Sequence, residues 1–227
     1  MKQKAIIIGN TDGIGLAITN KLLDDGWIVV GISKRESEIK NPLYIHIVSD
    51  VKENNFSEEL RIAAERIDPI DVCIYCAGIG ELLDTKDMNK EADIISVNLT
   101  GLVKTASQVI PLMTASGKGQ FIGLSSVADV MISPEAPSYH ASKAGFSNYM
   151  LGLAKAVKQK GVKVTNVRFG FVDTKMAKGD KKPFMMTVEK ATEHLLICID
   201  KKPVQYTAPR FVYSLALIAG WISKIKK

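Results

Sequence analysis

Three side chains in the middle of the chain have types and a spacing suited to proton transfer. Tyr139 and Lys143 lie four residues apart in the segment SYHASK, so on a helix they share one face, with Cβ atoms roughly 5–6 Å apart. A free tyrosine is a weak acid with a pKa near ~10, and a neighbouring ammonium group lowers that value. Ser126 ends the apolar run GQFIGLSS, which predicts a buried strand. Together they suit proton exchange with a carbonyl or alcohol oxygen.

The pair alone does not establish chemistry, because the same spacing occurs on helices as a solvated pair. The elements around it are more informative, since apolar runs alternate with helical patterns along the chain. The runs cover residues 5–9, 27–33, 44–50, 71–78, 120–126 and 162–170, with helices expected at about 14–25, near 56–67, at about 89–115 and around Tyr139. Strands that are apolar on both faces and separated by helices predict an α/β fold with a doubly wound parallel sheet of six to seven strands.

A glycine-rich turn, GNTDGIG, follows the first apolar run and opens the first helix. Such a turn lets the backbone approach a pyrophosphate, and the helix N-terminus offers free N–H groups and the positive end of its dipole. The spacing differs from the usual G-x-G-x-x-G fingerprint of dinucleotide-binding Rossmann folds. The turn predicts cofactor contacts from Gly9, Asn10, Thr11, Asp12, Gly13, Ile14 and Gly15.

The end of the second strand in such a fold usually contacts the adenosine ribose of a dinucleotide. An acidic residue there binds a ribose 2′-hydroxyl, whereas basic residues accommodate a 2′-phosphate. This chain has Ser33, Lys34 and Arg35, with no acid before Glu36, so NADP(H) is favoured and NAD(H) stays possible. Asp50, at the end of the third strand, either accepts from an adenine amino group or only caps the following turn.

Composition limits the classes of protein to consider. The chain has 227 residues, a net charge of +6 and 46% hydrophobic residues, which predicts one folded domain spanning 1–227 rather than disorder. The basic excess is concentrated in C-terminal lysines and indicates a solvated surface, with no basic helix of the kind that binds nucleic acid. The apolar run near the N-terminus is too short for a signal sequence, so we expect a cytoplasmic protein.

Cysteines and histidines give no metal site. Cys73 and Cys76 form C-x-x-C, a possible redox motif, but residues three apart on a strand point to opposite faces. Buried thiols are therefore favoured over a disulfide or shared metal. His46 and His194 are expected on a strand and a helix without partners, and His140 has no assigned role.

The C-terminal part contains two helical patterns. The first, VEKATEHLLICIDKK, places Ala191, Leu195 and either Cys198 or Ile199 inward. The second, RFVYSLALIAGWISKIKK, is too short to span a bilayer. It could pack on the sheet, form a subunit contact or lie in a membrane interface with its lysines toward headgroups.

Taken in order, these motifs resemble the short-chain dehydrogenase/reductase family through about Thr174. The matching segments are the glycine turn, Asp50 and Val51, the CAG turn of Cys76, Ala77 and Gly78, Asn98 in VNLTG, Ser126 thirteen residues before Tyr139, the YHASK motif, and RFGFVDT with Gly170, Val172 and Thr174. Four residues depart from the family pattern: Ile8 for threonine, Cys76 for asparagine, Asp129 for a common glycine and Phe169 for proline.

The resemblance implies roles for the catalytic residues. Tyr139 acts as general acid in reduction and base in oxidation, Ser126 binds the substrate oxygen, and Lys143 binds the nicotinamide ribose and lowers the pKa of Tyr139. Asn98 holds a water that links Lys143 to solvent. Homodimers or homotetramers are expected.

The substrate is less defined. By resemblance, residues 175–227 cover it, and Met176, Pro183, Phe184, Met185 and Met186 suit either a small hydrophobic substrate or ordinary core packing. The expected function is an NADP(H)-dependent oxidoreductase acting on a carbonyl/alcohol pair. The alternatives are a membrane-peripheral reductase of lipid-like carbonyls and a non-catalytic nucleotide-binding regulator.

Overall fold

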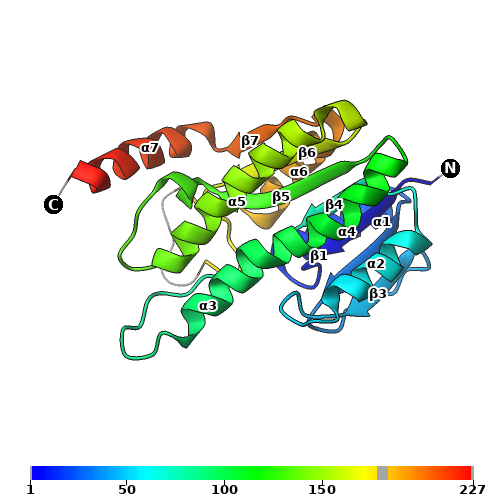
Figure 1. The fold of residues 1–227 in the computed structure, drawn as a ribbon, viewed down its shortest axis with the longest axis horizontal. Helices are drawn as coiled ribbons and strands as arrows, with labels where there is room; N and C mark the ends of the chain where they lie inside the picture. The colour runs from blue at the N-terminus through cyan, green and yellow to red at the C-terminus, as the bar shows by residue number, and fades with distance from the viewer. Residues whose placement is uncertain (1, 178–183, 226–227) are drawn as a thin grey trace.

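One parallel sheet organises the chain in the computed structural model, which describes residues 2–177 and 184–225 (Figure 1). Its strands are β1 Lys4–Ile8, β2 Ile28–Ser33, β3 Tyr44–Val48, β4 Val72–Tyr75, β5 Gln120–Ser126, β6 Lys163–Phe169 and β7 Gln205–Ala208. They lie in the order β3-β2-β1-β4-β5-β6-β7, and each neighbouring pair is parallel. The predicted doubly wound parallel sheet is confirmed. β7 is an additional strand that the apolar runs of the sequence do not predict.

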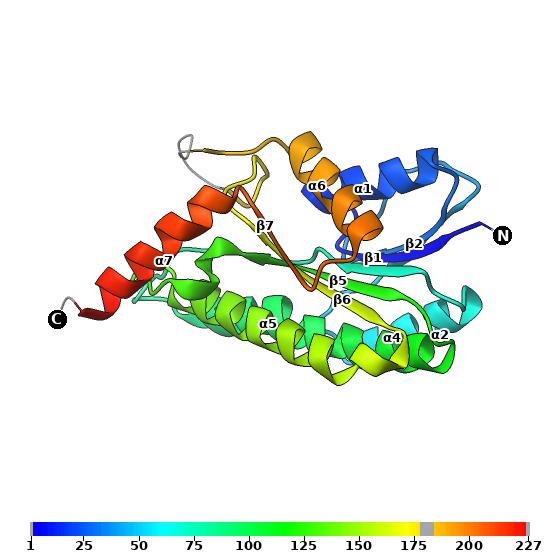
Figure 2. The same ribbon diagram turned by 90° about the horizontal axis from the view of Figure 1, so that it is seen from above.

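Helices cover both faces of this sheet. They are α1 Gly13–Asp24, α2 Phe56–Arg66, α3 Asn89–Ile95, α4 Gly101–Ala115, α5 Pro137–Ala156, α6 Val188–Lys201 and α7 Arg210–Ile225. Figure 2 shows α1 and α6 on one face and α2, α4 and α5 on the other. Each face has its own buried apolar cluster, one centred on Phe56, Tyr75 and Phe146, the other on Ile18 and Leu195. This two-sided burial explains why most strands are apolar on both faces.

The edge strand β3 departs from that pattern. Ile45 and Val48 are 44% and 47% exposed, because one face of an edge strand lies outside the helix layers. The expectation of burial on both faces is therefore wrong for β3. The bounds of the remaining predicted strands lie within three residues of the observed ones.

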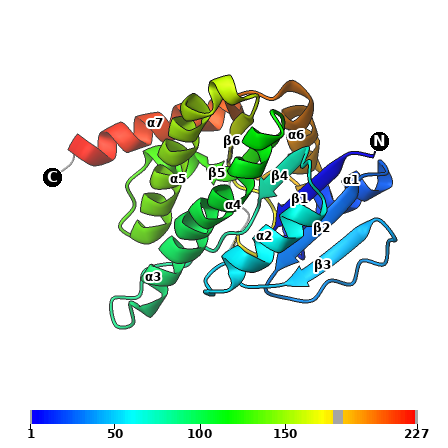
Figure 3. The same cartoon turned by 45° about the vertical axis from the view of Figure 1, so that its right-hand side comes forward.

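The helix predicted over about 89–115 is one rod, but it is not uniform. A π-helical turn, Ser96–Thr100, joins α3 to α4 and contains Asn98 (Figure 3). The buried Tyr75 hydroxyl donates to the carbonyl of Val97 within that turn. π turns often mark functional positions, since one extra residue re-aims the side chains that follow.

The order of the strands creates a crevice at their carboxyl ends. Successive connections run from β1 outward to β2 and β3, and the chain then crosses back to β4 on the other side of β1. In doubly wound sheets, ligands bind where the winding changes direction. A ligand-binding crevice is therefore expected beyond the ends of β1 and β4.

Gly123 allows α5 to approach β5 closely. A Cβ at this position would lie 2.7 Å from the ring of Phe146 and 2.9 Å from Met150, both on α5. The same helix carries Tyr139 and Lys143, and the same strand ends at Ser126. The missing side chain thus sets the helix–strand distance on which the predicted site depends.

The last helix, α7, projects beyond the sheet at the end of the molecule opposite the N-terminus (Figure 1). Gly220 rests on the chain after β5, because a Cβ there would lie 2.3 Å from the carbonyl oxygen of Val130. The outer face of α7 exposes Phe211, Leu215, Leu217, Ile218 and Trp221. The helix therefore packs on the domain along one side and leaves an apolar side uncovered in the monomer. Among the described residues, no helix has the length and hydropathy needed to cross a membrane.

Two glycine-to-alanine substitutions should have opposite effects on stability. We expect Gly123→Ala to lower the free energy of unfolding by about 1–3 kcal/mol, since the added methyl overpacks the α5–β5 contact. Gly152→Ala on α5, where no atom lies within 4 Å of the new Cβ, should raise it by about 0.5–1 kcal/mol through helix propensity. Urea unfolding measures the free energy of unfolding of both variants. An unchanged value for Gly123→Ala would contradict the close approach of α5 to β5.

Candidate active site

Lys143 is the buried centre of the candidate site. Its residue is 5% exposed, and Nζ donates to the carbonyl of Leu124 on β5 at 3.0 Å. Nζ also lies 5.8 Å from the centre of the Tyr139 ring and 5.0 Å from that of Phe146. Ser126, two residues after Leu124, interacts with the phenol of Tyr139. The structure therefore brings together the three residues singled out from the sequence.

Burial governs the ionisation of Lys143 and Tyr139. Burial lowers the pKa of Lys143 to about 8, and the nearby Asp129 and Cys76 partly oppose that change. Burial raises the pKa of Tyr139, and its interaction with Ser126 opposes the rise. The pKa of Tyr139 is therefore shifted upward, opposite to the lowering expected from the sequence, because burial outweighs the interaction with Ser126. The Tyr139 phenol is consequently protonated at pH 7.

Asn98 joins the loop after β4 to α5. Its Nδ2 donates to the carbonyl of Ile79 at 2.9 Å and to Ser142 Oγ at 3.0 Å, while Oδ1 accepts from the Ile79 amide at 2.8 Å. Gly78 packs next to it, since a Cβ there would lie 3.5 Å from Asn98 Oδ1 and 3.9 Å from Lys143 Nζ. Asn98 thus fixes the geometry around Lys143. Its predicted water-holding role stays a prediction.

The glycine turn forms a close-packed cradle. Gly9 has a φ of +83°, and a Cβ there would lie 2.7 Å from the backbone of Ala77. A Cβ at Gly15 would lie 2.0 Å from the carbonyl oxygen of Gly9, with the Cβ of Cys76 at 3.2 Å. Asp12 caps α1 by accepting from the Gly13 amide at 2.8 Å. The turn therefore places the N-terminus of α1 at the crevice, with bare backbone facing it.

Asn10 differs from the other predicted contacts in this turn. Its side chain is fully buried, and Nδ2 donates to the hydroxyl of Tyr44 on β3. It also fills the space over Gly31, where a Cβ would lie 2.1 Å from Nδ2. The Asn10 side chain therefore points into the protein, away from the crevice. A cofactor contact there would have to use its backbone.

The end of β2 contacts the glycine turn through polar groups. Ser33 Oγ lies 3.2 Å from Thr11 Oγ1, and Arg35 Nη2 lies 3.3 Å from Asp12 Oδ2. Lys175, from the segment after β6, reaches the same Asp12 oxygen at 3.1 Å. Burial would raise the pKa of Asp12, but the hydrogen bonds from these two cations and from the Gly13 amide bring it below its ordinary value.

Ser33, Arg35 and Thr11 thus meet at one end of the crevice, while Lys34 is exposed. A cavity of about 450 Å³ adjoins Thr11 and Arg35. Asp50 Oδ1 accepts from the Lys52 amide at 3.0 Å, so this residue caps its turn as one alternative predicted. Val51 is buried and packs against Gly101.

The segment after β6 contacts the glycine turn and the loop after β4. Gly170 bonds to β7, Val172 bridges to Met186, and a Cβ at Gly13 would lie 3.1 Å from Thr174. Met186 is a core residue. Met176 is 40% exposed and lies beside Gly78 and Gly80.

Gly80 in turn contacts the ring of Tyr139, since a Cβ there would lie 3.2 Å from that ring. Phe184 is 59% exposed and meets Phe211 of α7 edge-on. Of the two uses predicted for these side chains, core packing is therefore right for Met186, while Met176 and Phe184 remain exposed and available to a ligand. Pro183 lies outside the described residues.

A buried polar cluster behind Lys143 was missed as a functional feature. Asp129 follows Ser126 in a 3₁₀ turn; its Oδ2 accepts from Ser147 Oγ at 2.6 Å and lies 3.8 Å from Arg168 Nη1. Burial raises the pKa of Asp129, while Ser147 and Arg168 oppose the rise. The signal in the sequence was an acid where a glycine is common.

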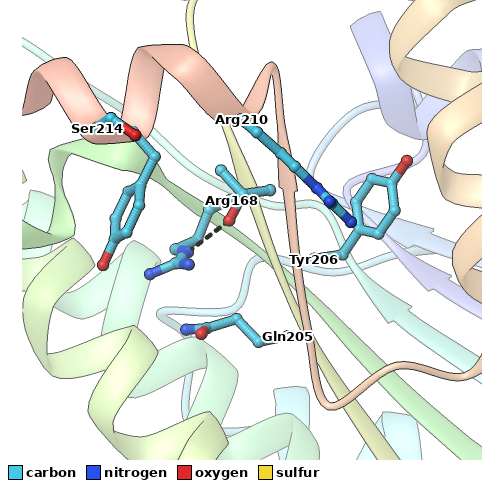
Figure 4. A pocket seen from close by; sticks show the side chains of 7 residues that line it. Arg168, Gln205, Tyr206, Arg210 and Ser214 are labelled. Carbon is cyan, nitrogen blue, oxygen red and sulfur yellow. Dashed lines mark hydrogen bonds between the residues drawn. The ribbon is translucent and has the colours of Figure 1, made fainter.

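Arg168 extends this cluster to the edge of the sheet. Its Nε donates to Thr207 of β7 at 3.0 Å, and its guanidinium stacks 3.7 Å from the ring centre of Tyr213 on α7. Figure 4 shows this group in a cavity of about 320 Å³ beside Gln205. The cluster links the last helix to the chain around Ser126.

Cysteines and histidines partly follow expectation. Cys73, Cys76 and Cys198 are free thiols, and burial raises the pKa of Cys76 to about 12. Among residues 2–177 and 184–225, no group of three acidic, histidine or cysteine side chains is placed to hold a metal ion. The expectation that His46 and His194 lack partners is wrong. His46 bonds to Tyr44 and to the Arg35 carbonyl, and His194 bonds to Tyr206.

A parallel sheet with a glycine cradle and a Ser–Tyr–Lys group at its carboxyl edge defines a dinucleotide-type oxidoreductase site, and the comparisons agree. The family model for short chain dehydrogenases matches residues 3–183, so the chain belongs to the short-chain dehydrogenase family. An uncharacterized oxidoreductase of Staphylococcus haemolyticus is 31% identical over 185 residues, 76% of this chain and 79% of that protein. One from Staphylococcus aureus strain MRSA252 is 29% identical over 182 residues, 75% and 78% of the two chains.

Solved structures share the fold. A short chain dehydrogenase from Burkholderia cenocepacia in complex with NADP has a TM-score of 0.86 at 21% identity, covering 98% of this chain and 95% of that one. One from Sphingobium yanoikuyae with NADPH has a TM-score of 0.81 at 19% identity, covering 99% and 97%. A 4-hydroxyisoleucine dehydrogenase with NADH has a TM-score of 0.78 at 18% identity, covering 91% and 96%. The protein is an oxidoreductase, which decides against the non-catalytic alternative.

Replacing Lys143 by methionine should stabilise the fold at neutral pH. The pKa falls from an ordinary 10.5 to about 8, which at about 1.4 kcal/mol per pH unit disfavours the charged, folded state by about 3 kcal/mol below pH 8. Between pH 8 and 10.5 the unfolded chain binds more protons, so the stability of the wild type rises with pH in that window. The advantage of Lys143→Met over wild type should therefore shrink by about 3 kcal/mol from pH 7 to pH 10.5.

Urea unfolding at several pH values measures this difference. Lys155→Met, an exposed lysine on the same helix, is the matched control for loss of a lysine charge. A Lys143→Met stability difference that does not change with pH would contradict the buried, destabilised ammonium.

Proposed function

We propose that the protein transfers a hydride between NADP(H) and a carbonyl/alcohol pair. The observation that carries this proposal is the convergence of buried Lys143, Tyr139 and Ser126 at the carboxyl end of β5, beside the glycine cradle. The cofactor would supply the hydride. The residues of this chain bind, orient and exchange the proton.

Tyr139 gives the proton to the substrate oxygen in reduction. The phenol is protonated at neutral pH, as an acid must be, but burial raises its pKa and so makes it a weaker proton donor. Ser126 donates to the same oxygen and stabilises charge as it develops. Lys143, with a pKa of about 8, is charged at pH 7 and stabilises the phenolate left on Tyr139. Asn98 keeps the loop after β4 and α5 at the distance this arrangement needs.

The residues at the cofactor end fit a phosphorylated dinucleotide. The cradle of Gly9 and Gly15 has no room for side chains, so backbone amides can approach a pyrophosphate. Ser33 and Arg35 converge on Thr11, where a ribose 2′-phosphate would need a hydroxyl and a cation. Two cations, Arg35 and Lys175, face the single carboxylate of Asp12, so the local charge favours the phosphate. The relatives solved with NADP and NADPH support this choice, and NAD(H) remains the alternative.

The proposed substrate is small and hydrophobic. Exposed Met176 lies beside Gly78 and Gly80 and so borders the ring of Tyr139, and exposed Phe184 follows the segment 178–183. We assign residues 175–227 as the part of the domain that covers the substrate. Apolar, flexible side chains there suit a substrate held by packing more than by charge.

The test is a panel of small aldehydes and ketones assayed by NADPH oxidation, with Tyr139→Phe as the decisive variant. We expect Tyr139→Phe to lower kcat by roughly 10²–10⁴-fold, because the proton donor is lost. The Kd for NADPH should stay close to the wild-type value, since the ring and its packing remain. Wild-type turnover in this variant would contradict the role of Tyr139, and tighter binding of NADH than of NADPH would contradict the cofactor assignment.

The proposal includes a cytoplasmic homo-oligomer, dimer or tetramer. The uncovered apolar side of α7 supports a contact with a second copy of the chain, because such a contact would bury side chains that are exposed in the monomer. The alternative use of the same side is contact with a membrane surface by an enzyme acting on lipid-like carbonyls. Both uses depend on Leu215, Ile218 and Trp221, which are all more than half exposed.

Liposome flotation of the full chain and of a truncation after Arg210 separates these two uses. We expect neither protein to float with anionic vesicles, and we expect the full chain to sediment as an oligomer. Flotation of the full chain that the truncation abolishes would favour the membrane use instead. A monomeric, non-floating full chain would contradict both.

A further inference from the structure

A continuous chain of hydrogen bonds runs behind the cofactor end of the crevice, through the edge strand β3. It begins at Asn10 in the glycine turn, whose Nδ2 bonds to the hydroxyl of Tyr44. The Tyr44 hydroxyl lies 2.9 Å from His46 Nδ1, and His46 Nε2 lies 2.9 Å from the carbonyl oxygen of Arg35. One pair of side chains on β3 therefore connects the turn after β1 to the turn after β2.

The chemistry of the groups fixes the direction of this chain. A carbonyl oxygen only accepts, so His46 Nε2 carries a hydrogen and donates to Arg35. The amide Nδ2 of Asn10 only donates, so the Tyr44 oxygen accepts from it and its own hydrogen is free for His46 Nδ1. Burial raises the pKa of Tyr44, which keeps that hydrogen in place, although Ser37 and Asn10 oppose the rise. Every link is thus satisfied in one order, from Asn10 to Arg35.

The packing around this chain leaves little freedom. Asn10 is fully buried, and Gly31 on β2 makes room for both polar ends: a Cβ there would lie 2.1 Å from Asn10 Nδ2 and 2.7 Å from the Tyr44 hydroxyl. The Tyr44 and His46 rings stack with their centres 5.9 Å apart. The pair is therefore held in place before any ligand arrives.

The far end of the chain is the backbone of the residue that would meet a 2′-phosphate. The Arg35 carbonyl accepts from His46 and also from Ser33 Oγ at 3.2 Å, while the Arg35 guanidinium reaches Asp12. Arg35 is itself exposed, and its turn is otherwise on the surface. Without the bond from His46, ordering this turn and its long side chain would reduce the free energy gained on binding.

We propose that Tyr44 and His46 are positioning residues that set the preference of this protein for a nicotinamide cofactor bearing a 2′-phosphate. The inference rests on the proposed function, in which Arg35 binds that phosphate. The proposed effect of His46 is indirect, through its hydrogen bond to the backbone carbonyl of Arg35. A cofactor with a free 2′-hydroxyl makes no use of the guanidinium, so its binding should depend far less on His46.

The experiment measures the Kd of NADPH and of NADH by fluorescence titration for the wild type and four variants. His46→Ala should weaken NADPH binding by roughly 3–10-fold, the effect of one lost hydrogen bond, and NADH binding by less than about 2-fold. Tyr44→Phe keeps the ring and should show a smaller change in the same direction. His46→Gln, whose amide can donate to the same carbonyl, should recover most of the NADPH affinity.

His194→Ala is the matched control, because His194 also bonds through Nδ1 to a tyrosine hydroxyl, that of Tyr206 at 2.8 Å, on the other side of the fold. It should leave both Kd values unchanged. An equal loss of NADPH and NADH affinity in His46→Ala would overturn the inference, since it would show a general structural role. If His46→Ala does not fold, the ratio of the Kd for NADH to the Kd for NADPH in Tyr44→Phe and His46→Gln decides instead.

The two levels of proposal fail in different ways. A wild type that binds NADH as tightly as NADPH contradicts the proposed cofactor, and the inference with it. A wild type that prefers NADPH, with His46→Ala and Tyr44→Phe retaining the full preference, overturns the inference and leaves the proposed function standing.

Discussion

The burial of one ammonium group, that of Lys143, is the constraint to which the rest of the site is fitted. A charged amine between a helix and a sheet is unfavourable unless it is bonded and balanced. The Leu124 carbonyl provides the bond, the Phe146 ring lies under the charge, and Asp129 contributes the opposite sign. The close approach of α5 to β5 at Gly123 brings the Leu124 carbonyl and the Phe146 ring close to this ammonium group. Two large apolar clusters, one on each face of the sheet, provide the stability that tolerates the buried charge.

The same constraint explains how proton chemistry is divided in the site. Burial acts in opposite directions on the two groups, disfavouring the ammonium of Lys143 and the phenolate of Tyr139. At neutral pH the lysine nevertheless stays charged and the tyrosine stays neutral. In the proposed reaction, the ammonium of Lys143 would offset this effect of burial by stabilising the phenolate that forms when Tyr139 gives up its proton.

Much of this arrangement could be predicted from the sequence because it is local. The spacing of Tyr139 and Lys143 follows from helix geometry, and the apolar run ending at Ser126 follows from strand burial. The features that were missed depend on contacts between distant segments. β7 is four residues, QYTA, without an apolar run, and it forms because β6 offers an edge. The orientation of Asn10 and the partners of His46 depend on β3 lying next to β2, which no single segment reveals.

The departure at Asp129 shows how one substitution can connect remote parts of a chain. A buried carboxylate requires a cation, and Arg168, on the strand next to β5, lies 3.8 Å from it. Arg168 then needs partners of its own, which are Thr207 on β7 and the ring of Tyr213 on α7. The last helix is thus docked through a charge placed three residues after Ser126, so its position follows from the electrostatics of the site as well as from its apolar residues. Because Phe211 of α7 also meets Phe184, this helix connects the chain around Phe184 with the charge of Asp129 beside Lys143.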